Sequence, residues 1–345
     1  MERFIGLDAH ASSCTVAVVG PSGKRLSSSV LETNAQAIVE YLRQIPRQRR
    51  LCIEEGVHSA WLYEMLSPHV DEMVVVAITD KRRGPKSDRI DAFDLAEQLR
   101  VGAVPRRVFK EVGRYGTLRA LVQMHAKVVQ DLVRIKNRIK ALYRSRGVST
   151  SGIEVYREAT RKARMAELPL KMRSAAQVLY LELDAMQSVH AEAEREVLAE
   201  AKKHRAVSLL QTAPGIGPIR AAQIVAVVVS PHRFRTKRQL WSYSGLGILM
   251  RSSADYVRRD QTWAFEPVKQ TRGLNRCHNH SLKGVFKGAA MTAIGREGPL
   301  KEHYERLCAQ GTKPNLARLT IARKIAAVVL AMWKQEEVYD PARKH

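Results

Sequence analysis

The sequence predicts three parts: an α/β domain over residues 1–107, a long helical region over residues 108–205, and a mainly α-helical C-terminal domain over residues 206–345. Three observations support this division. Short β-rich runs alternate with segments of helical spacing in the first hundred residues. Apolar residues then recur every three or four positions over long stretches that lack breakers. Glycine and proline return from Ala206 onward, which is typical of a separate compact unit.

The N-terminal part is expected to begin with an antiparallel meander, because its first three β-rich runs are joined by short turns. Thr33 or Asn34 can cap the helix that follows. A continuous apolar run, typical of a central strand, precedes the third helix, which is expected from about Asp88 to Arg100. The predicted order is β-β-β-α-β-α-β-α, with strands expected at Phe4–Asp8, Cys14–Val19, Arg25–Leu31, Leu51–Glu54 and Met73–Ile78.

The helical region carries two long amphipathic patterns. The first includes Leu118, Val122 and Leu132 on one stripe, and the second runs from about Met172 to Lys202. Helices of this length favour an antiparallel coiled-coil arm that serves oligomerisation. Two helices packing on a globular core are the alternative.

The charge of the chain indicates its partner. Lys and Arg number 58 against 34 acidic residues, which gives a formal net charge of +24. Such an excess is expected of a protein that neutralises nucleic-acid phosphates. The longest apolar run, Ala221–Val229, is far shorter than the ~20 residues needed to span a bilayer, so a membrane role is not expected. The start lacks the pattern of a secretory signal, and a cytoplasmic, nucleoid-associated location is expected.

Four acidic residues stand at element ends that meet in this order of strands and helices. Asp8 ends the first strand, Glu54 ends the fourth, and Asp88 and Asp91 open the third helix. Several carboxylates in one cleft are costly unless cations neutralise them, so the group predicts a site for two Mg²⁺ ions, with Mn²⁺ as the alternative metal. These features predict a ribonuclease-H-like metal nuclease domain.

Each acidic residue has a simpler interpretation. Asp88 could cap its helix, Asp91 could be a favourable charge in the first helical turn, and Asp8 could be a turn residue. Glu55 is the rival of Glu54, which is preferred because it continues the strand alternation from Cys52. The joint placement of the four acids favours the metal site.

A glycine-rich turn, APGIGPI, lies between two helical segments in the C-terminal domain. Gly215 and Gly217 allow a tight turn that exposes backbone N–H groups at a helix N-terminus, as in helix-hairpin-helix elements that bind a DNA backbone. Gly-Pro turns between packed helices are also common. The predicted nucleic-acid contacts include these two glycines and a basic cluster just downstream, of which the principal members are Arg235, Lys237 and Arg238, with His232 and Arg233 beside them.

The next segment offers a candidate nucleophile. Ser252 and Ser253 follow Arg251 and precede Arg258 and Arg259. These guanidinium groups could hold a scissile phosphate and favour a serine alkoxide. Most serines are surface or capping residues, so spacing alone does not decide this role.

Together these pieces resemble the DEDD transposases of the insertion-sequence one-ten family, particularly its one-eleven-eleven branch. The matching segments cover nearly the whole chain in the same order: IGLDAH, CIEEG, KSDRIDAFDLA, APGIGP followed by SGLG and RSS, and TRGLNRCHNHSLK. The resemblance implies a RuvC-like domain that uses Asp8, Glu54, Asp88 and Asp91 with Mg²⁺. It also implies a coiled-coil linker and a C-terminal domain that supplies a nucleophilic serine.

The sequence departs from the family pattern at two points. RSSAD replaces the common serine-glycine, so Ser253 matches by position and Ser252 remains the alternative. Glu55-Gly56-Val57 replaces the usual threonine-glycine after the glutamate, which leaves Glu55 open beside Glu54.

The resemblance further implies a DNA transposase or site-specific recombinase that forms a phosphoserine link to DNA. Its partners would be double-stranded DNA of the element ends and target, a structured bridge RNA that delegates sequence reading to base pairing, and further copies of the chain in a dimer or tetramer. A metal-dependent junction nuclease that uses the four acids alone is one alternative. A non-catalytic DNA-binding protein is another.

Overall fold

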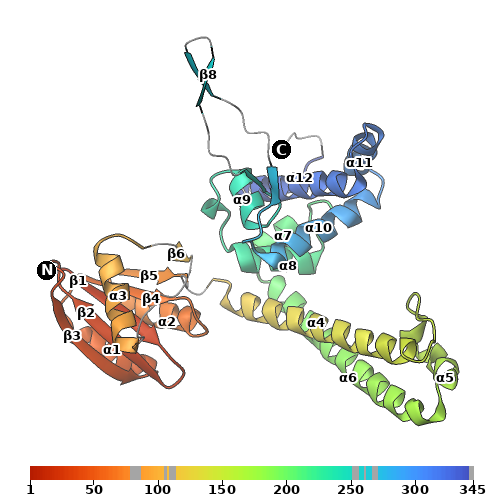
Figure 1. The fold of residues 1–345 in the computed structure, drawn as a ribbon, viewed down its shortest axis with the longest axis horizontal. Coiled ribbons are helices and arrows are strands. Elements are labelled where there is room, and N and C mark those ends of the chain that lie inside the picture. The colour runs from red at the N-terminus through yellow and green to blue at the C-terminus, as the bar shows by residue number, and fades with distance from the viewer. Residues whose placement is uncertain are drawn as a thin grey trace. The chain divides into compact units, whose positions relative to one another are not determined.

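The structure, a computed structural model, describes residues 1–77, 87–104, 107–108, 114–250, 256–259, 262–265 and 271–341. It contains two compact units, Met1–Arg114 and Tyr115–His345 (Figure 1). The predicted limits of three domains stay a prediction.

The first unit is built on a mixed six-stranded sheet. Its strand order is β3-β2-β1-β4-β5-β6, with β1 antiparallel to β2 and parallel to β4. The predicted order of strands and helices is confirmed, and a two-residue strand is added at the edge. The elements are β1 Arg3–Ala9, β2 Ser13–Val19, β3 Arg25–Glu32, α1 Ala35–Gln44, β4 Arg49–Glu54, α2 Ser59–Leu66, the 3-10 helix η1 Ser67–His69, β5 Glu72–Val76, α3 Asp88–Arg100 and β6 Arg107–Val108.

Helices cover both faces of this sheet (Figure 1). On one face, Leu42 of α1 and Leu62 of α2 pack with Leu7 of β1 in one apolar cluster. The other face is covered by α3, whose Ala96 shares a second cluster with Phe4 of β1. The alternation of side chains along β1 therefore assigns Phe4 to the α3 face and Leu7 to the α1–α2 face.

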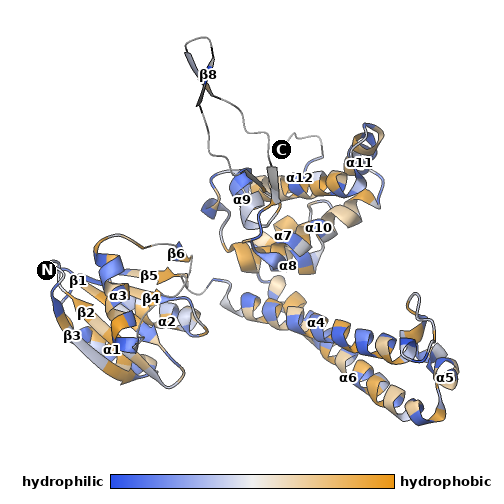
Figure 2. Cartoon of the chain, viewed as in Figure 1, coloured by the Kyte–Doolittle hydropathy of each residue, from blue (hydrophilic) through white to orange (hydrophobic). Residues whose placement is uncertain are grey.

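The second unit begins with two long helices, α4 Gly116–Arg144 and α6 Leu170–Ala201, in the regions where the sequence predicts them. They are joined through the 3-10 helix η2 Glu154–Tyr156 and α5 Glu158–Ala166. Val122 near the start of α4 shares a cluster with Val197 near the end of α6, so the helices run antiparallel. Figure 2 shows hydrophilic and hydrophobic residues alternating along both helices. We call this pair the arm.

A buried pair of tyrosines closes the far end of the arm. The Tyr180 hydroxyl donates to the Val155 carbonyl oxygen at 2.9 Å, and the Tyr143 and Tyr180 hydroxyl oxygens are 2.9 Å apart. Because the single proton of Tyr180 goes to Val155, Tyr143 donates to Tyr180. These bonds fix η2 against both long helices.

The remainder of the second unit packs around α12, whose apolar side chains are almost all buried. Two pairs of short antiparallel strands, β7 with β10 and β8 with β9, add to the helices. None of the helices that the structure describes could cross a membrane, given their length and hydropathy. The elements are α7 Arg205–Leu210, α8 Pro218–Val228, η3 Pro231–Arg233, α9 Lys237–Tyr243, β7 Ile248–Met250, β8 Tyr256–Arg259, β9 Thr262–Phe265, β10 Thr271–Leu274, α10 His280–Ile294, α11 Pro299–Ala309 and α12 Pro314–Gln335.

Candidate catalytic site and nucleic-acid interface

Two of the predicted carboxylates stand side by side at the ends of parallel strands. Leu7 of β1 pairs with Ile53 of β4, so Asp8 and Glu54 occupy the next position in the register. Strand alternation puts Asp8 on the same face of the sheet as Phe4, which is the face that α3 covers. Glu54 lies on that face too, because it comes two residues after Cys52, which packs in the same apolar cluster as α3. The sheet therefore presents both acids on the same face at the same edge.

Helix α3 brings the other two acids toward this edge. It packs so closely on β1 that a Cβ atom at Gly6 would lie 1.9 Å from the carbonyl oxygen of Ala92. Asp88 and Asp91 lie in the first turn of α3, just before Ala92. The N-cap is Ser87, whose side chain accepts from the Ile90 N–H, so the interpretation of Asp88 as the capping residue is wrong.

His10 connects two of these carboxylates. Its Nε2 atom lies 3.3 Å from Oδ2 of Asp8 and 3.4 Å from Oδ1 of Asp88. One ligand atom from each of the three residues lies within 4.8 Å of the others. The sequence reasoning did not select His10, although it follows Asp8 by two positions in IGLDAH and strand alternation could have suggested it.

The negative charge of this edge affects two buried thiols. Burial raises the pKa of Cys14 from 9.0 to about 11, and the charge of Asp8 adds to this effect. Burial likewise raises the pKa of Cys52 to about 12; Arg107 opposes the shift, and Glu54 and Glu72 add to it. Both thiols are therefore neutral at physiological pH.

The residues present fit a hard divalent cation. Asp8 and Asp88 already converge on one imidazole nitrogen, that of His10, and carboxylate oxygens are the ligands that Mg²⁺ prefers. Glu54 lies on the face of Asp8, whereas Glu55 is the next residue and its N–H donates to the Val76 carbonyl oxygen. The strand geometry thus favours Glu54 over Glu55 as the third acid.

The glycine turn of the second unit joins α7 to α8. Gly215 has φ +72°, and a Cβ atom there would lie 2.2 Å from the Ala289 carbonyl oxygen of α10. Its own carbonyl oxygen accepts from Arg220 at 2.7 Å. Gly217 is the N-cap of α8, and a Cβ atom there would meet nothing within 4 Å. Gly215 therefore serves packing, and Gly217 is the glycine with an open approach.

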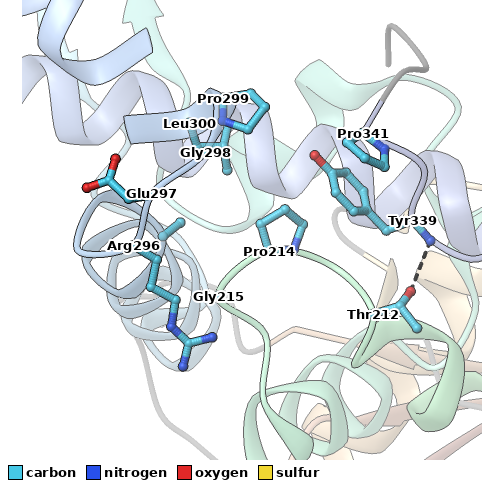
Figure 3. Close-up of a pocket in the computed structure, with 11 residues that line it drawn as sticks. Thr212, Pro214, Gly215, Arg296, Glu297, Gly298, Pro299, Leu300, Tyr339 and Pro341 are labelled. Carbon is cyan, nitrogen blue, oxygen red and sulfur yellow. Dashed lines mark hydrogen bonds between the residues drawn. The ribbon is translucent and has the colours of Figure 1, made fainter. Parts of the chain in front are cut away.

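A cavity of about 240 Å³ lies beside this turn. Figure 3 shows Pro214 between the Arg296–Leu300 segment and Tyr339, whose N–H donates to the Thr212 hydroxyl at 3.0 Å. The turn is thus held between the start of α11 and the chain that follows α12.

The basic cluster downstream divides into two roles. Arg233 donates from Nη1 to the carbonyl oxygens of Val227 and Val228 at 3.2 and 3.0 Å. Its guanidinium group therefore caps the C-terminal end of α8. Arg235, Lys237 and Arg238 are exposed, as is His232. The exposed cations are the ones that remain suited to phosphate contacts.

The SGLG segment leads to the predicted nucleophile. The N–H groups of Leu246 and Gly247 donate to the Trp241 carbonyl oxygen, and Arg323 donates to the Leu246 carbonyl oxygen at 2.7 Å. A Cβ atom at Gly245, which has φ +67°, would lie 2.4 Å from the His278 ring. This turn leads directly into β7, which pairs with β10 in antiparallel orientation. Arg251, Ser252 and Ser253 lie outside the described residues.

The strands β8 and β9 form an antiparallel ribbon. Arg258 is exposed and pairs in register with Trp263, whose exposed fraction is 68%. Arg259 lies on the same strand, opposite Thr262. An exposed cation beside an exposed aromatic ring is a combination that nucleic-acid-binding surfaces use.

A mixed sheet with this order, helices on both faces and carboxylates at the ends of its central strands define a ribonuclease-H-like domain, the class of fold that carries many DNA-processing enzymes. A transposase family profile matches residues 5–145. A second profile, described as the transposase IS116/IS110/IS902 family, matches residues 207–265. The two matches together cover more than half of the chain, including nearly all of the first unit.

One relative matches this chain over nearly its full length, and others match part of it. A 44.8-kDa protein of insertion element IS116 from Streptomyces clavuligerus is 24% identical over 98% of this chain and 96% of its own length. The transposase of insertion sequence IS1111A from Coxiella burnetii is 26% identical over 74% of this chain and 68% of its own. The pilin gene-inverting protein of Moraxella lacunata is 23% identical over 39% of this chain and 38% of its own. The chain belongs to the IS110 family of transposases, as the sequence predicts.

Proposed function

We propose that this transposase cleaves and rejoins DNA strands at a composite centre made of the carboxylates of the first unit and a serine of the second. The single observation that carries the proposal is the convergence of Asp8 and Asp88 on His10, at the edge where Glu54 ends the neighbouring strand. Asp91, in the first turn of α3, completes the set.

Asp8, Glu54, Asp88 and Asp91 would hold Mg²⁺ or Mn²⁺. When bound, such ions supply charge stabilisation to the phosphate that reacts. The protein contributes the placement: β1 and β4 fix Asp8 and Glu54 through their register, and the contact of α3 with Gly6 fixes the two helix acids. His10 orients the Asp8 and Asp88 carboxylates by lying between them.

Ser253, with Ser252 as the alternative, would supply the nucleophile. Its Oγ would form a bond to phosphorus while the bridging P–O bond of the DNA strand breaks, which leaves a phosphoserine link. What supports this role is the resemblance of the segment and the firmly held turn at Leu246 and Gly247 that precedes it. Arg251, Arg258 and Arg259 would hold the phosphate.

The DNA backbone would lie against the second unit at the N-terminus of α8. Gly217 gives an open approach there, and a helix N-terminus favours phosphate. Exposed Arg235, Lys237 and Arg238 add positive charge along the chain that follows. The net charge of +24 suits both DNA and a structured bridge RNA, which the family resemblance suggests as the guide.

Copies of the chain would associate through the arm. Val178, Leu181 and Val189 of α6 are 63%, 60% and 48% exposed and recur at a spacing of three and eight residues, with exposed Ala185 between the last two. Such a stripe on an exposed helix is typical of coiled-coil contacts between identical chains. A dimer or tetramer would allow carboxylates and serine from different copies to meet.

The experiment that tests the mechanism looks for a covalent protein–DNA adduct. The full-length protein is incubated with DNA of the element ends, Mg²⁺ and RNA transcribed from the element. We expect an adduct that is lost in Asp8→Asn and in a Ser252→Ala, Ser253→Ala double variant. If the double variant cleaves DNA without forming an adduct, the result would instead support the junction nuclease. If Asp8→Asn still cleaves DNA, both the serine transposase mechanism and the junction nuclease mechanism would be excluded, because each depends on Asp8.

A further inference from the structure

A group of three metal-ligating side chains lies in the arm, outside the carboxylate site. His125 comes from α4, and His190 and Glu194 come from α6. One ligand atom from each lies within 4.8 Å of the other two. His190 and Glu194 are four residues apart, so one turn of α6 presents both on the same side.

The three residues occupy a layer between two apolar clusters. Toward the start of α4, Val122 packs with Val197. Toward the other end of the arm, Leu132 packs in a cluster with Leu183. The polar layer therefore interrupts an otherwise apolar seam between the two helices.

His125 is buried without a hydrogen-bond partner for one of its nitrogens. Its side chain is 6% exposed, and its Nε2 atom has no partner among the residues that the structure describes. The ring centroids of His125 and His190 are 5.1 Å apart, and His190 Nδ1 lies 4.0 Å from Glu194 Oε2, too far for a hydrogen bond. Buried polar atoms are normally paired, so this nitrogen calls for a ligand.

We propose that His125, His190 and Glu194 bind a divalent transition-metal ion, with Zn²⁺ the best fit, and that the ion ties α4 to α6 in a fixed register. Two imidazoles and a carboxylate form a familiar ligand set for Zn²⁺, which accepts a water as its fourth ligand. Tetrahedral ligands at zinc bond lengths lie about 3.4 Å apart, so the three groups need to close by little more than about 1 Å.

The protonation of the cluster suits a metal. Burial lowers the pKa of His125, and His190 adds to this shift while Glu194 opposes it. His125 is therefore neutral near pH 7, the form that binds metals. The arm site offers two imidazoles and one carboxylate, whereas the carboxylate site combines one imidazole, that of His10, with oxygen ligands that prefer Mg²⁺.

The test uses the full-length protein, freed of its purification tag and stripped with EDTA, and titrates it with Co²⁺ as a spectroscopic substitute for Zn²⁺. We expect one equivalent to give the intense visible absorption of a tetrahedral site, and Zn²⁺ to abolish that absorption by displacement. Zn²⁺ should also raise the temperature of unfolding, because the ion binds only the folded arm.

Variants locate the site. His190→Ala and Glu194→Gln lie at partly exposed positions and should leave the helical circular-dichroism signal intact while weakening Co²⁺ binding on the order of tenfold or more. Glu192→Gln, on the same helix but outside the cluster, should bind like the wild type. Asp8→Asn should also keep the Co²⁺ spectrum. An unchanged Co²⁺ affinity in both His190→Ala and Glu194→Gln, or equal loss in Glu192→Gln, would overturn the proposal.

Discussion

Gly6 of β1 lies directly against Ala92 of α3, so closely that a Cβ atom at Gly6 would be 1.9 Å from the Ala92 carbonyl oxygen and 2.7 Å from the Ala96 nitrogen. Both neighbours are backbone atoms of one helix and cannot rotate away. This contact places the first turn of α3, with Asp88 and Asp91, near Asp8 at the end of β1. A residue with no chemistry of its own thus sets the geometry of the acidic edge.

Gly6→Ala should therefore destabilise the protein and disable the site. The added methyl group must push α3 away from the sheet, at a cost of about 1–3 kcal/mol in the free energy of unfolding. DNA cleavage should fall further than the loss of folded protein explains. Gly20→Ala is the matched control, since its Cβ atom would meet Leu26 at an ordinary 3.6 Å and should change stability by less than about 0.5 kcal/mol. Equal effects of the two substitutions on urea unfolding would contradict this account.

A comparison of substitutions at Glu54 and Glu55 tests which of the two supplies the third carboxylate of the site. Glu54 shares the α3 face with Asp8, whereas alternation turns Glu55 away. We expect Glu54→Gln to lower the rate of strand cleavage on the order of a hundredfold or more, as when one group that stabilises developing charge is lost. Glu55→Gln should retain most activity. The measurement is single-turnover cleavage of end DNA with Mg²⁺, and the reverse ranking would assign the ligand to Glu55.

Much of this geometry could be predicted from the sequence, because strand order and element ends follow from apolar periodicity. Alternation along Phe4–Asp8 and the position of Glu54 at a strand end suffice to bring two acids together. Alternation also puts His10 on the same face as Asp8, but it does not reveal what His10 contacts. An exposed histidine beyond a strand has many uses, and only the position of Asp88 from α3 shows that it lies between two carboxylates.

Packing also decides which residues of a sequence motif remain exposed and can therefore approach a DNA phosphate. Gly215 and Gly217 are equivalent in the string APGIGPI, yet only Gly215 is pressed against α10. Arg233 belongs to the basic run by sequence, but its guanidinium group is used by the carbonyl oxygens at the end of α8. The role of Gly215 depends on a partner more than fifty residues away, and the role of Arg233 depends on where a helix ends. The apolar periodicity of the sequence predicts neither contact.

The exposed basic residues should govern the salt dependence of DNA binding. Neutralising Arg235, Lys237 and Arg238 together to Gln should weaken binding to any sequence and reduce the slope of log Kd against log salt by about 2.7, since each phosphate contact releases about 0.9 counterion. Arg233→Gln should leave the slope nearly unchanged and lower the unfolding temperature instead, because two carbonyl oxygens lose their donor. Fluorescence anisotropy at several salt concentrations measures the slope. A triple variant with the wild-type slope would remove these residues from the interface.

The exposed stripe on α6 should determine the oligomeric state. Leu181→Asp places a charge in the middle of the stripe, and we expect light scattering to show a shift toward monomer at micromolar concentration. Val30→Asp is the control, since Val30 is 71% exposed on β3 in the other unit and lies far from the arm in sequence. The circular-dichroism signal should stay the same in both variants. If Leu181→Asp has the mass of the wild type, the arm is not the contact between copies.

The cysteines of the sheet should report the integrity of the acidic edge. The pKa of Cys14 is raised to about 11 and that of Cys52 to about 12, chiefly by burial, so at pH 8 only about one Cys14 in a thousand is a thiolate. A thiol reagent should therefore modify exposed Cys277 quickly and leave the two sheet cysteines intact until urea unfolds the first unit.

The raised pKa values of Cys14 and Cys52 also set the direction in which the stability of the folded protein changes with pH. Ionised thiols are disfavoured in the folded sheet, so their contribution to stability is complete below the ordinary thiol pKa of 9.0 and declines as the pH rises from there toward 11. A Cys14→Ala, Cys52→Ala variant should lose less stability over this range in urea titrations than the wild type. If instead Cys14 reacts as fast as Cys277 in the native protein at pH 8, then β2 is not held against β1 as described, and the position of Asp8 would have to be reconsidered with it.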